Sequence, residues 1–202
     1  NPCRSPNVKC KLNGVISVVS ELAMVGIGIF APMSKALLKF QHLESLIAVR
    51  IFSGHIPQWI SNLSPRLKKL SLNSNRLEGP IPESIAYLKN LEDFQAFEQC
   101  SYLKKLDKNP HDNGRPCRRM YRVKWDRYDE AAPFDWSCGG LSGTIPSRIQ
   151  TMTKLRVFWV DENRLTGPLP GWFAKMPNLE KLDLFGNKFH GQVPVEWKQK
   201  KS

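Results

Sequence analysis

Apolar residues recur at a fixed spacing along this chain of 202 residues. The fullest form of the spacing is Leu-x-x-Leu-x-Leu-x-x-Asn-x-Leu-x-Gly-x-Ile-Pro, and it stands with few changes at residues 67–82, 155–170 and 179–194. Self-similarity at a constant period is typical of repeat architectures, in which each unit packs only against its neighbours. The pattern therefore predicts a repeat protein.

The positions within one repeat, residues 67–82, have separate physical roles. Leu70 and Leu72 alternate as apolar residues do along a half-buried strand. Asn75 follows, and its amide can bond backbone groups where the chain bends away from the strand. Because a single unit cannot bury its own leucines, neighbouring units must stack. The repeat therefore predicts an α/β repeat solenoid with one short strand in each unit.

The closing Gly-x-Ile-Pro of each unit resembles the plant-type class of leucine-rich repeat, which is found in plant receptor ectodomains and polygalacturonase-inhibitor-like proteins. The resemblance implies a short horseshoe of about six repeats with a parallel concave sheet. Gaps of 25, 25, 64, 24 and 24 residues separate the closing prolines, which are Pro32, Pro57, Pro82, Pro146, Pro170 and Pro194. The gap of 64 residues indicates one repeat that carries a long insertion.

We expect a single leucine-rich-repeat domain over residues 1–202. Its expected parts, in chain order, are an N-terminal Cys cap at 1–11, repeats at 12–98, an inserted loop at 99–139, repeats at 140–197 and a basic tail at 198–202. The resemblance covers nearly all of the chain except the insertion.

Five cysteines favour an oxidising compartment. Cys3 and Cys10 are similar in spacing to the cysteine pair of the N-terminal cap in plant repeat proteins, and the resemblance implies a disulfide between them. The amphipathic helix that usually precedes this pair is missing, and the sequence contains neither an initiator Met nor a signal peptide, so we expect a processed or trimmed chain. Asn62 begins a glycosylation sequon, but Pro65 behind it weakens acceptor use and leaves modification open.

Residues 12–33 form the most apolar run and invite a transmembrane interpretation. Glu21 lies in the middle of the run and Pro32 at its end, and an acidic residue at mid-bilayer costs several kcal/mol. Leu22, Ile27 and Pro32 also fall at repeat positions. We therefore expect a buried first repeat.

The insertion contains three cysteines whose pairing the sequence leaves open. Because both ends of the loop must return to adjacent positions of one coil, a Cys100–Cys138 disulfide would join them at its base. The alternatives are Cys100–Cys117 and Cys117–Cys138. Such long loops on a rigid scaffold often carry function.

Basic and aromatic residues alternate within the insertion. Arg118, Arg119 and Arg122 lie close to Tyr121 and Trp125, and Arg, Tyr and Trp often supply the binding energy of interfaces. This composition predicts a docking loop, and the alternative is a solvated excursion whose aromatic residues pack on the solenoid. The formal net charge of +12 permits an anionic surface as a partner, but no nucleic-acid-binding motif accompanies the charge.

Catalytic and metal-binding patterns are missing from the sequence. The four histidines are scattered, and Gly140-Leu141-Ser142-Gly143 belongs to a repeat rather than to a nucleophile elbow. The sequence has no zinc-like Cys-x-x-Cys pair and no phosphate-binding loop. We therefore expect neither an enzyme nor a cofactor or metal site.

Aligning repeats two to six predicts three columns of outward-facing residues on the concave sheet. The columns are Ser45, Lys69, Asp93, Val157, Lys181; Ile47, Ser71, Gln95, Trp159, Asp183; and Val49, Asn73, Phe97, Asp161, Phe185. Large aromatic residues occur at outward-facing positions where small polar residues would be enough for the fold. Exposed apolar clusters of this kind usually mark a partner surface, and the alternative is that the insertion itself covers part of this row. The expected apolar-acidic patch consists of Phe97, Trp159, Phe185, Asp93, Asp161 and Asp183.

Taken with the resemblance, these features predict a non-catalytic interaction module of the secretory pathway or cell exterior. It would bind a protein or peptide through the concave face and the basic-aromatic insertion. The family resemblance also allows inhibition of a wall-degrading enzyme. The alternative is an accessory structural subunit that stabilises a large membrane assembly in an organelle lumen, for example that of the thylakoid, with membrane contact only through that assembly.

Overall fold

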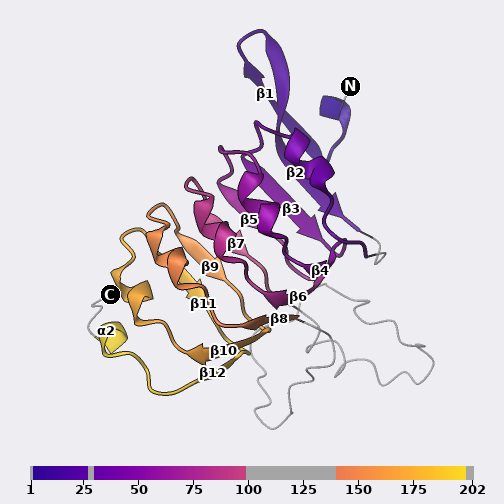
Figure 1. The fold of residues 1–202 in the computed structure, drawn as a ribbon. Coiled ribbons are helices and arrows are strands. Elements are labelled where there is room, and N and C mark those ends of the chain that lie inside the picture. The colour runs from indigo at the N-terminus through magenta and orange to yellow at the C-terminus, as the bar shows by residue number, and fades with distance from the viewer. Residues whose placement is uncertain (1, 27–29, 99–139, 199–202) are drawn as a thin grey trace, which may run out of the picture.

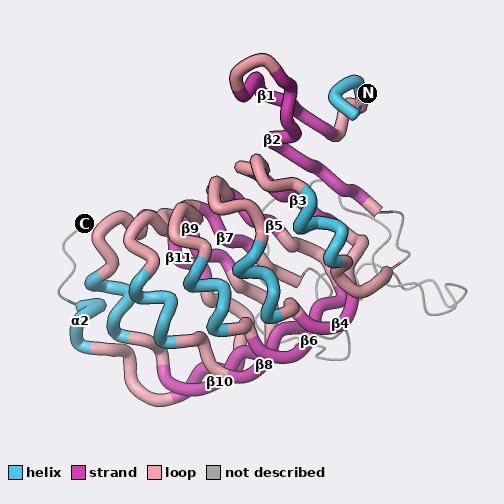
Figure 2. The backbone as a smooth tube through the Cα atoms, turned by 45° about the horizontal axis from the view of Figure 1, so that its top comes forward, coloured by secondary structure: helices cyan, strands magenta, loops and turns pink. Residues whose placement is uncertain are grey.

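The computed structural model describes residues 2–26, 30–98 and 140–198. These residues form a solenoid of coils that stack along one axis from the N-terminal hairpin to the C-terminal helix (Figure 1). Each coil contributes one strand to a first sheet, most coils contribute a strand to a second sheet, and short helices lie between them (Figure 2). The predicted repeat solenoid is confirmed.

The first sheet has seven strands in the order β1-β2-β3-β5-β7-β9-β11 and is parallel from β2 onward. The apolar strand positions Leu46, Leu70, Phe94, Phe158 and Leu182 lie in register across it. The predicted parallel sheet of six repeat strands is therefore confirmed. The strands are β1 (Val8–Asn13), β2 (Ile16–Val25), β3 (Ser45–Val49), β5 (Lys69–Ser71), β7 (Asp93–Gln95), β9 (Val157–Trp159) and β11 (Lys181–Asp183).

The second sheet is built by the segments that lead into the closing Gly-x-Ile-Pro-type sequence of each repeat. Its order is β12-β10-β8-β6-β4, and its pairs are parallel. Gly79 has φ +72°, and a Cβ there would lie 2.2 Å from Cδ2 of His55, so glycine suits this position for both reasons. The strands are β4 (Ser53–His55), β6 (Arg76–Pro80), β8 (Gly140–Gly143), β10 (Arg164–Pro168) and β12 (Lys188–His190).

Short helices form the third side of the coils. The closing prolines at 57, 82, 146 and 170 stand at the N-cap positions of four of them, because the fixed φ of proline suits an extended residue before a helix. In the described part of the chain, no helix combines the length and apolar character that crossing a membrane requires. The helices are η1 (Pro2–Arg4), η2 (Lys35–Lys39), η3 (Gln58–Asn62), η4 (Glu83–Tyr87), η6 (Ser147–Thr151), η7 (Gly171–Lys175) and α2 (Val195–Lys198).

The core runs through the middle of the coils as a continuous apolar stack. The ring centroid of Phe158 lies 5.5 Å from that of Phe94 and 5.4 Å from that of Phe173. Beside this stack, the buried amide of Asn75 accepts from Ile51 N at 2.9 Å and Phe52 N at 2.8 Å in the preceding coil. The repeat asparagine thus joins neighbouring coils as well as closing its own bend.

The N-terminal segment forms a hairpin that the sequence did not predict. Cys3 and Cys10 form the implied disulfide, and β1 pairs antiparallel with β2. Within 12–33, Leu22 takes the repeat position beside Leu46, but the hairpin tip leaves Val15 fully exposed. The expectation of a buried first repeat was therefore wrong for the tip, because β3 pairs with β2 only over Glu21–Val25 and the tip extends beyond it. Ile27 lies outside the described residues.

The coils on both sides of the insertion keep one register. Asp93 pairs with Val157 in the first sheet, and Glu78 pairs with Gly140 in the second. One coil is therefore interrupted without displacing the next. The predicted residues Cys100, Cys117, Cys138, Arg118, Arg119, Arg122 and Trp125 lie outside the described residues.

Candidate binding surface on the concave sheet

The strand register determines which outward-facing side chains are neighbours. Ile47, Ser71, Gln95, Trp159 and Asp183 follow one another across the sheet, as aligned from the sequence. The column that begins at Ser45 is in register in the same way. The repeat alignment across the insertion is therefore correct at these positions.

From Asn73 onward, the third predicted column lies just beyond the strand ends and is held by backbone hydrogen bonds. Ser74 N donates to Phe97 O at 2.8 Å, and Glu162 N donates to Phe185 O at the same distance. Glu98 N donates to the carbonyl of Asp161 at 3.4 Å. These bonds place the aromatic and acidic residues of this column in adjacent coils.

Three aromatic side chains contribute to this face to different degrees. Trp159 and Phe97 are half-buried, whereas Phe185 is 46% exposed. Trp159 stands between Gln95 and Asp183 in the sheet register. The predicted aromatic residues are therefore accessible in part, and the ring of Trp159 has polar neighbours on both sides.

A hydrogen-bonded network joins side chains on and just after β5 and β7 in the middle of this face. Lys69 Nζ lies 2.7 Å from Asp93 Oδ2, and Gln95 Nε2 donates to Asp93 Oδ1 at 2.9 Å. Asn73 Nδ2 donates to Gln95 Oε1 at 2.9 Å, and Asn73 Oδ1 accepts from Phe97 N at 3.3 Å. The charge of Asp93 is thus balanced by Lys69 within the chain, unlike the charges of the other two predicted aspartates, Asp161 and Asp183. Sequence reasoning placed these residues in columns but missed the network.

Asp161 and Asp183 form an acidic region next to that network. Burial is the main cause that raises the pKa of Asp161 to about 7, and the charges of Asp183 and Glu162 raise it further. Asp183 Oδ1 accepts a hydrogen bond from Phe185 N at 3.0 Å. In the part of the chain that the structure describes, neither aspartate forms a salt bridge. This region therefore favours a partner that brings hydrogen-bond donors or positive charge.

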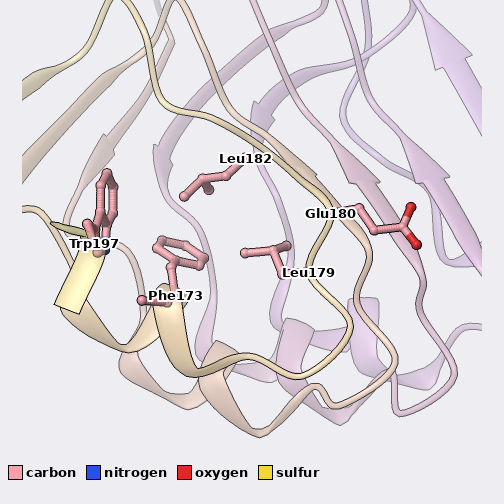
Figure 3. Close-up of a pocket in the computed structure, with 6 residues that line it drawn as sticks. Phe173, Leu179, Glu180, Leu182 and Trp197 are labelled. Atoms are coloured by element: carbon pink, nitrogen blue, oxygen red, sulfur yellow. The ribbon is translucent and has the colours of Figure 1, made fainter. Parts of the chain in front are cut away.

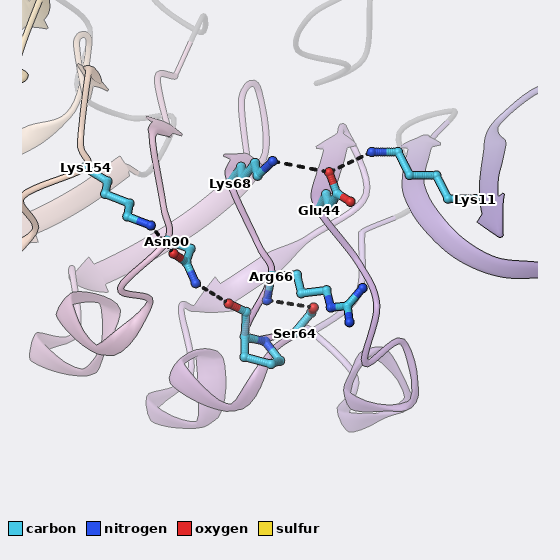
Figure 4. Close-up of polar contacts among 8 residues, drawn as sticks. Lys11, Glu44, Ser64, Arg66, Lys68, Asn90 and Lys154 are labelled. Carbon is cyan, nitrogen blue, oxygen red and sulfur yellow. Dashed lines mark hydrogen bonds and ion pairs between the residues drawn. The ribbon is translucent and has the colours of Figure 1, made fainter. Parts of the chain in front are cut away.

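A row of alternating charges runs along the edge where the coils enter the sheet. Glu44 Oε2 lies 2.8 Å from Lys11 Nζ and 3.6 Å from Lys68 Nζ (Figure 4). The bond from Lys11 is the first cause that lowers the pKa of Glu44. These exposed pairs contribute little individually, but they favour one stacking register. The full row, which the sequence reading missed, is Lys11, Glu44, Lys68, Glu92, Arg156 and Glu180.

The described residues offer no assembled site for a metal ion. Among them, no group of three or more His, Cys, Asp or Glu side chains is close enough to act as ligands. The concave face can instead supply aromatic contact area, amide and carboxylate hydrogen-bond partners, and local negative charge. These are the components of a surface that binds another polypeptide.

Comparisons with known proteins match this architecture. Residues 66–88, 154–176 and 178–199 match a family profile described as Leucine Rich Repeat. Receptor-like protein 35 of Arabidopsis thaliana is 33% identical over 142 residues, which are 70% of this chain and 13% of that protein. Receptor like protein 27 of the same plant is 31% identical, with 64% of this chain and 17% of that protein covered. The chain thus spans less than a fifth of these relatives.

Solved structures show the same fold at low sequence identity. The BIR3 - SERK2 complex from Arabidopsis thaliana superposes with a TM-score of 0.66 at 22% identity, covering 95% of this chain and 80% of that chain. The ectodomain of the receptor kinase SOBIR1 from the same plant gives 0.65 at 19%, covering 96% and 87%. A plant ice-binding protein gives 0.68 at 20%, covering 96% and 50%. Because these proteins differ in what they are described to bind, the likeness establishes the fold alone.

Proposed function

This chain is a plant-type leucine-rich repeat protein, and we propose that it is a non-catalytic module that binds a protein or peptide partner on its concave sheet. The observation that carries the proposal is the row in which half-buried Trp159 stands beside Asp183, with Asp161 and Phe185 in the adjoining column. An aromatic side chain that packs against apolar groups, next to acceptors for hydrogen bonds, is a common arrangement at interface centres.

The aspartates give this surface a polarity that differs from the rest of the chain. The sequence as a whole carries a formal charge of +12, whereas Asp161 and Asp183 have no salt-bridge partner among the described residues. Asp93 belongs to the surface but is held by Lys69. A partner with amide groups opposite Asp161, whose raised pKa of about 7 leaves it partly protonated near neutral pH, and basic groups opposite Asp183 would therefore be recognised by hydrogen bonds and charge as well as by contact area.

The insertion supplies a second part of the proposed interface. Its Arg118, Arg119, Arg122 and Trp125 belong to the segment 99–139, which begins two residues after Phe97 in the sequence, and long loops on a rigid scaffold often carry binding residues. Basic residues there would contact acidic groups of the partner. Such an arrangement would use charges of both signs and would favour one orientation of the partner.

The relatives support a place outside the cell for this binding function. Those reported above are receptor-like proteins. The Cys3–Cys10 disulfide is consistent with the secretory pathway. The alternative of a structural subunit in an organelle lumen has no support from these comparisons, and we do not propose it.

Pull-down of partners from an extract of the source tissue tests the proposal. Trp159→Ala should reduce recovery of a specific partner at least several-fold, because it removes the aromatic centre of the surface. Tyr87→Ala is the matched control, since Tyr87 is an exposed aromatic residue of η4 on another side of the coil. Equal recovery of the partner with wild type, Trp159→Ala and Tyr87→Ala would show that the concave face around Trp159 does not bind it.

A further inference from the structure

The concave sheet has an apolar area on β2 and β3. Leu46 and Ala48 of β3 are fully buried. Since side chains alternate along a strand, Ile47 and Val49 face the concave side. Val25 of β2 pairs in register with Val49 and is 66% exposed. Val25, Ile47 and Val49 therefore form one patch on this face, the aliphatic region.

The same face is aromatic and acidic on β9 and β11. Leu182 of β11 packs against the core and lines one recess together with Phe173 and Leu179 (Figure 3). The alternation of side chains therefore places Asp183 on the concave side, next to Trp159 in the sheet register. A cationic side chain can lie over the ring of Trp159 and pair with the carboxylate of Asp183.

The side chains between these two areas bond one another. Ser71 and Gln95 occupy the register positions between Ile47 and Trp159. Asn73 Nδ2 donates to Ser71 Oγ at 3.0 Å and to Gln95 Oε1 at 2.9 Å. Because these groups bond within the chain, they require no particular side chain from a partner.

The strand spacing sets the distance between the aliphatic region and Trp159. Ile47 and Trp159 lie three strand intervals apart, which is roughly 14 Å at ~4.8 Å for each interval. An extended chain rises ~3.3 Å for each residue, so about four residues cover this distance. Residues separated by an even number of positions in an extended segment point to the same side. A segment that crosses the strands can therefore place one side chain on each area.

We infer that the partner is an extended peptide segment that carries an apolar residue and, about four positions away, an arginine or lysine. This inference rests on the proposed function, because it names the chemistry of the partner for the same surface. The apolar residue packs on the aliphatic region, and the basic side chain lies over Trp159 and pairs with Asp183. The residues between them cross the hydrogen-bonded middle of the sheet and can vary.

The charges around Asp183 favour one position for the basic group. Lys181 faces the same side two residues earlier in β11 and would repel it. Asp161 follows Trp159 by two residues, and its carboxylate is close enough to Asp183 for the two charges to interact. The basic group is therefore held on the side of Asp183 that is nearer Asp161.

Selection from a phage-displayed library of random linear dodecapeptides tests the inference without knowledge of the natural partner. The full chain is immobilised, and the bound peptides are sequenced. We expect enriched peptides to share an apolar residue and an arginine or lysine about four positions apart. Separation by an odd number of positions is the internal control, because it turns the two side chains to opposite sides of an extended peptide, and it should not be enriched.

Two variants locate a selected peptide, which is labelled and titrated by fluorescence anisotropy. Val25→Thr keeps a β-branched shape but presents a hydroxyl, and it should weaken binding about fivefold or more. Asp183→Asn keeps an acceptor for Phe185 N but removes the charge, and it should weaken binding of the basic peptide but not of its alanine counterpart. Val193→Thr is the matched control, since Val193 is 51% exposed and follows β12 of the second sheet, and it should leave binding unchanged.

The inference is overturned if no peptide is enriched, or if the enriched peptides lack the paired residues. Equal binding by the wild type, Val25→Thr and Asp183→Asn, each shown by thermal unfolding to be folded, would also overturn it. Capture of the natural partner separates this failure from that of the proposed function. If capture depends on Trp159 but not on Val25 or Asp183, only this inference fails, whereas capture that does not depend on Trp159 contradicts the proposed function.

Discussion

Asn163 Nδ2 donates to the carbonyl of Ala96 at 2.7 Å, although 67 residues separate the two in the sequence. Asn163 Oδ1 also accepts from Leu141 N at 2.8 Å. Since Ala96 precedes residues 99–139 and Leu141 follows them, one buried amide joins both sides of the interrupted coil. The repeat asparagine therefore keeps the two halves of the solenoid in register.

Asn163→Ala should destabilise the protein more than loss of an ordinary surface amide. It removes four hydrogen bonds of a buried side chain, and at about 1 kcal/mol net for each bond we expect a loss of roughly 2–4 kcal/mol. Denaturant unfolding measures the free energy. Asn178→Ala is the control, because its exposed amide makes one bond to Thr153 O, and it should cost less than about 1 kcal/mol. Equal losses of unfolding free energy in the two variants would contradict the role of Asn163 in joining the two sides of the interrupted coil.

The pKa of Asp161 predicts a dependence of stability on pH. Its ordinary value of 3.8 is raised to about 7 in the folded chain, mainly by burial. The folded state therefore holds the proton more tightly, and this contribution to stability is full below about 3.8 and is lost as pH rises through about 7. Asp161→Asn should therefore raise the melting temperature, relative to wild type, more at pH 8 than at pH 5.

Asp93→Asn provides the control for that experiment. Asp93 bonds Lys69 at 2.7 Å, so its replacement should lower the melting temperature at both pH values instead of raising it at pH 8. If Asp161→Asn shows the same difference from wild type at pH 5 and pH 8, Asp161 does not titrate in this range.

Gly26 should tolerate no side chain where the first two coils meet. A Cβ there would lie 2.1 Å from the carbonyl oxygen of Arg50, and backbone cannot move aside without disturbing the sheet. We expect Gly26→Ala to cost about 2 kcal/mol or more in thermal or denaturant unfolding. Gly14→Ala is the comparison, since that glycine has φ +68° but no atom within 4 Å of a Cβ, and should cost about 1 kcal/mol. A smaller loss at Gly26 would contradict the close contact.

Deleting residues 101–137 should leave the solenoid folded while reducing partner binding. The register of both sheets continues across the insertion, and long surface excursions add little closure entropy, about 0.6 kcal/mol for each doubling of length. Circular dichroism and thermal unfolding report the fold, and partner capture reports binding. Unfolding of the shortened chain would show that the insertion covers part of the core. If the shortened chain folds and captures the partner as well as the wild type does, the insertion does not contribute to binding and the concave sheet binds the partner alone.

Much of this architecture could be predicted because the repeat sets spacing directly. The repeat length that aligns Leu46 with Leu70 also aligns the outward-facing residues next to them. The columns of the concave sheet could therefore be predicted once the insertion was recognised. The hairpin of β1 and β2 could not be found in this way, because the periodicity of the apolar run at 12–33 does not distinguish a repeat coil from an antiparallel pair of strands.

The polar details of the candidate surface were less predictable for another reason. Whether Asp93 is neutralised and Asp161 is not depends on which side chains the sheet brings together from 24 residues away and on local burial. Alternation of charge along the coil edge, with Glu44 between Lys11 and Lys68, likewise requires the register. Composition and net charge do not reveal such pairs, because they are sums over all residues and do not say which side chains are neighbours.

Site-specific photo-crosslinking tests the central claim, that a polypeptide partner occupies the concave sheet, most directly. A photoreactive benzoylphenylalanine replaces Trp159 in one preparation and Tyr87 of η4 in another, and each is irradiated with the same tissue extract. We expect a discrete crosslinked partner from position 159 and none from position 87. Crosslinking of that partner from position 87 but not from position 159 would contradict the account.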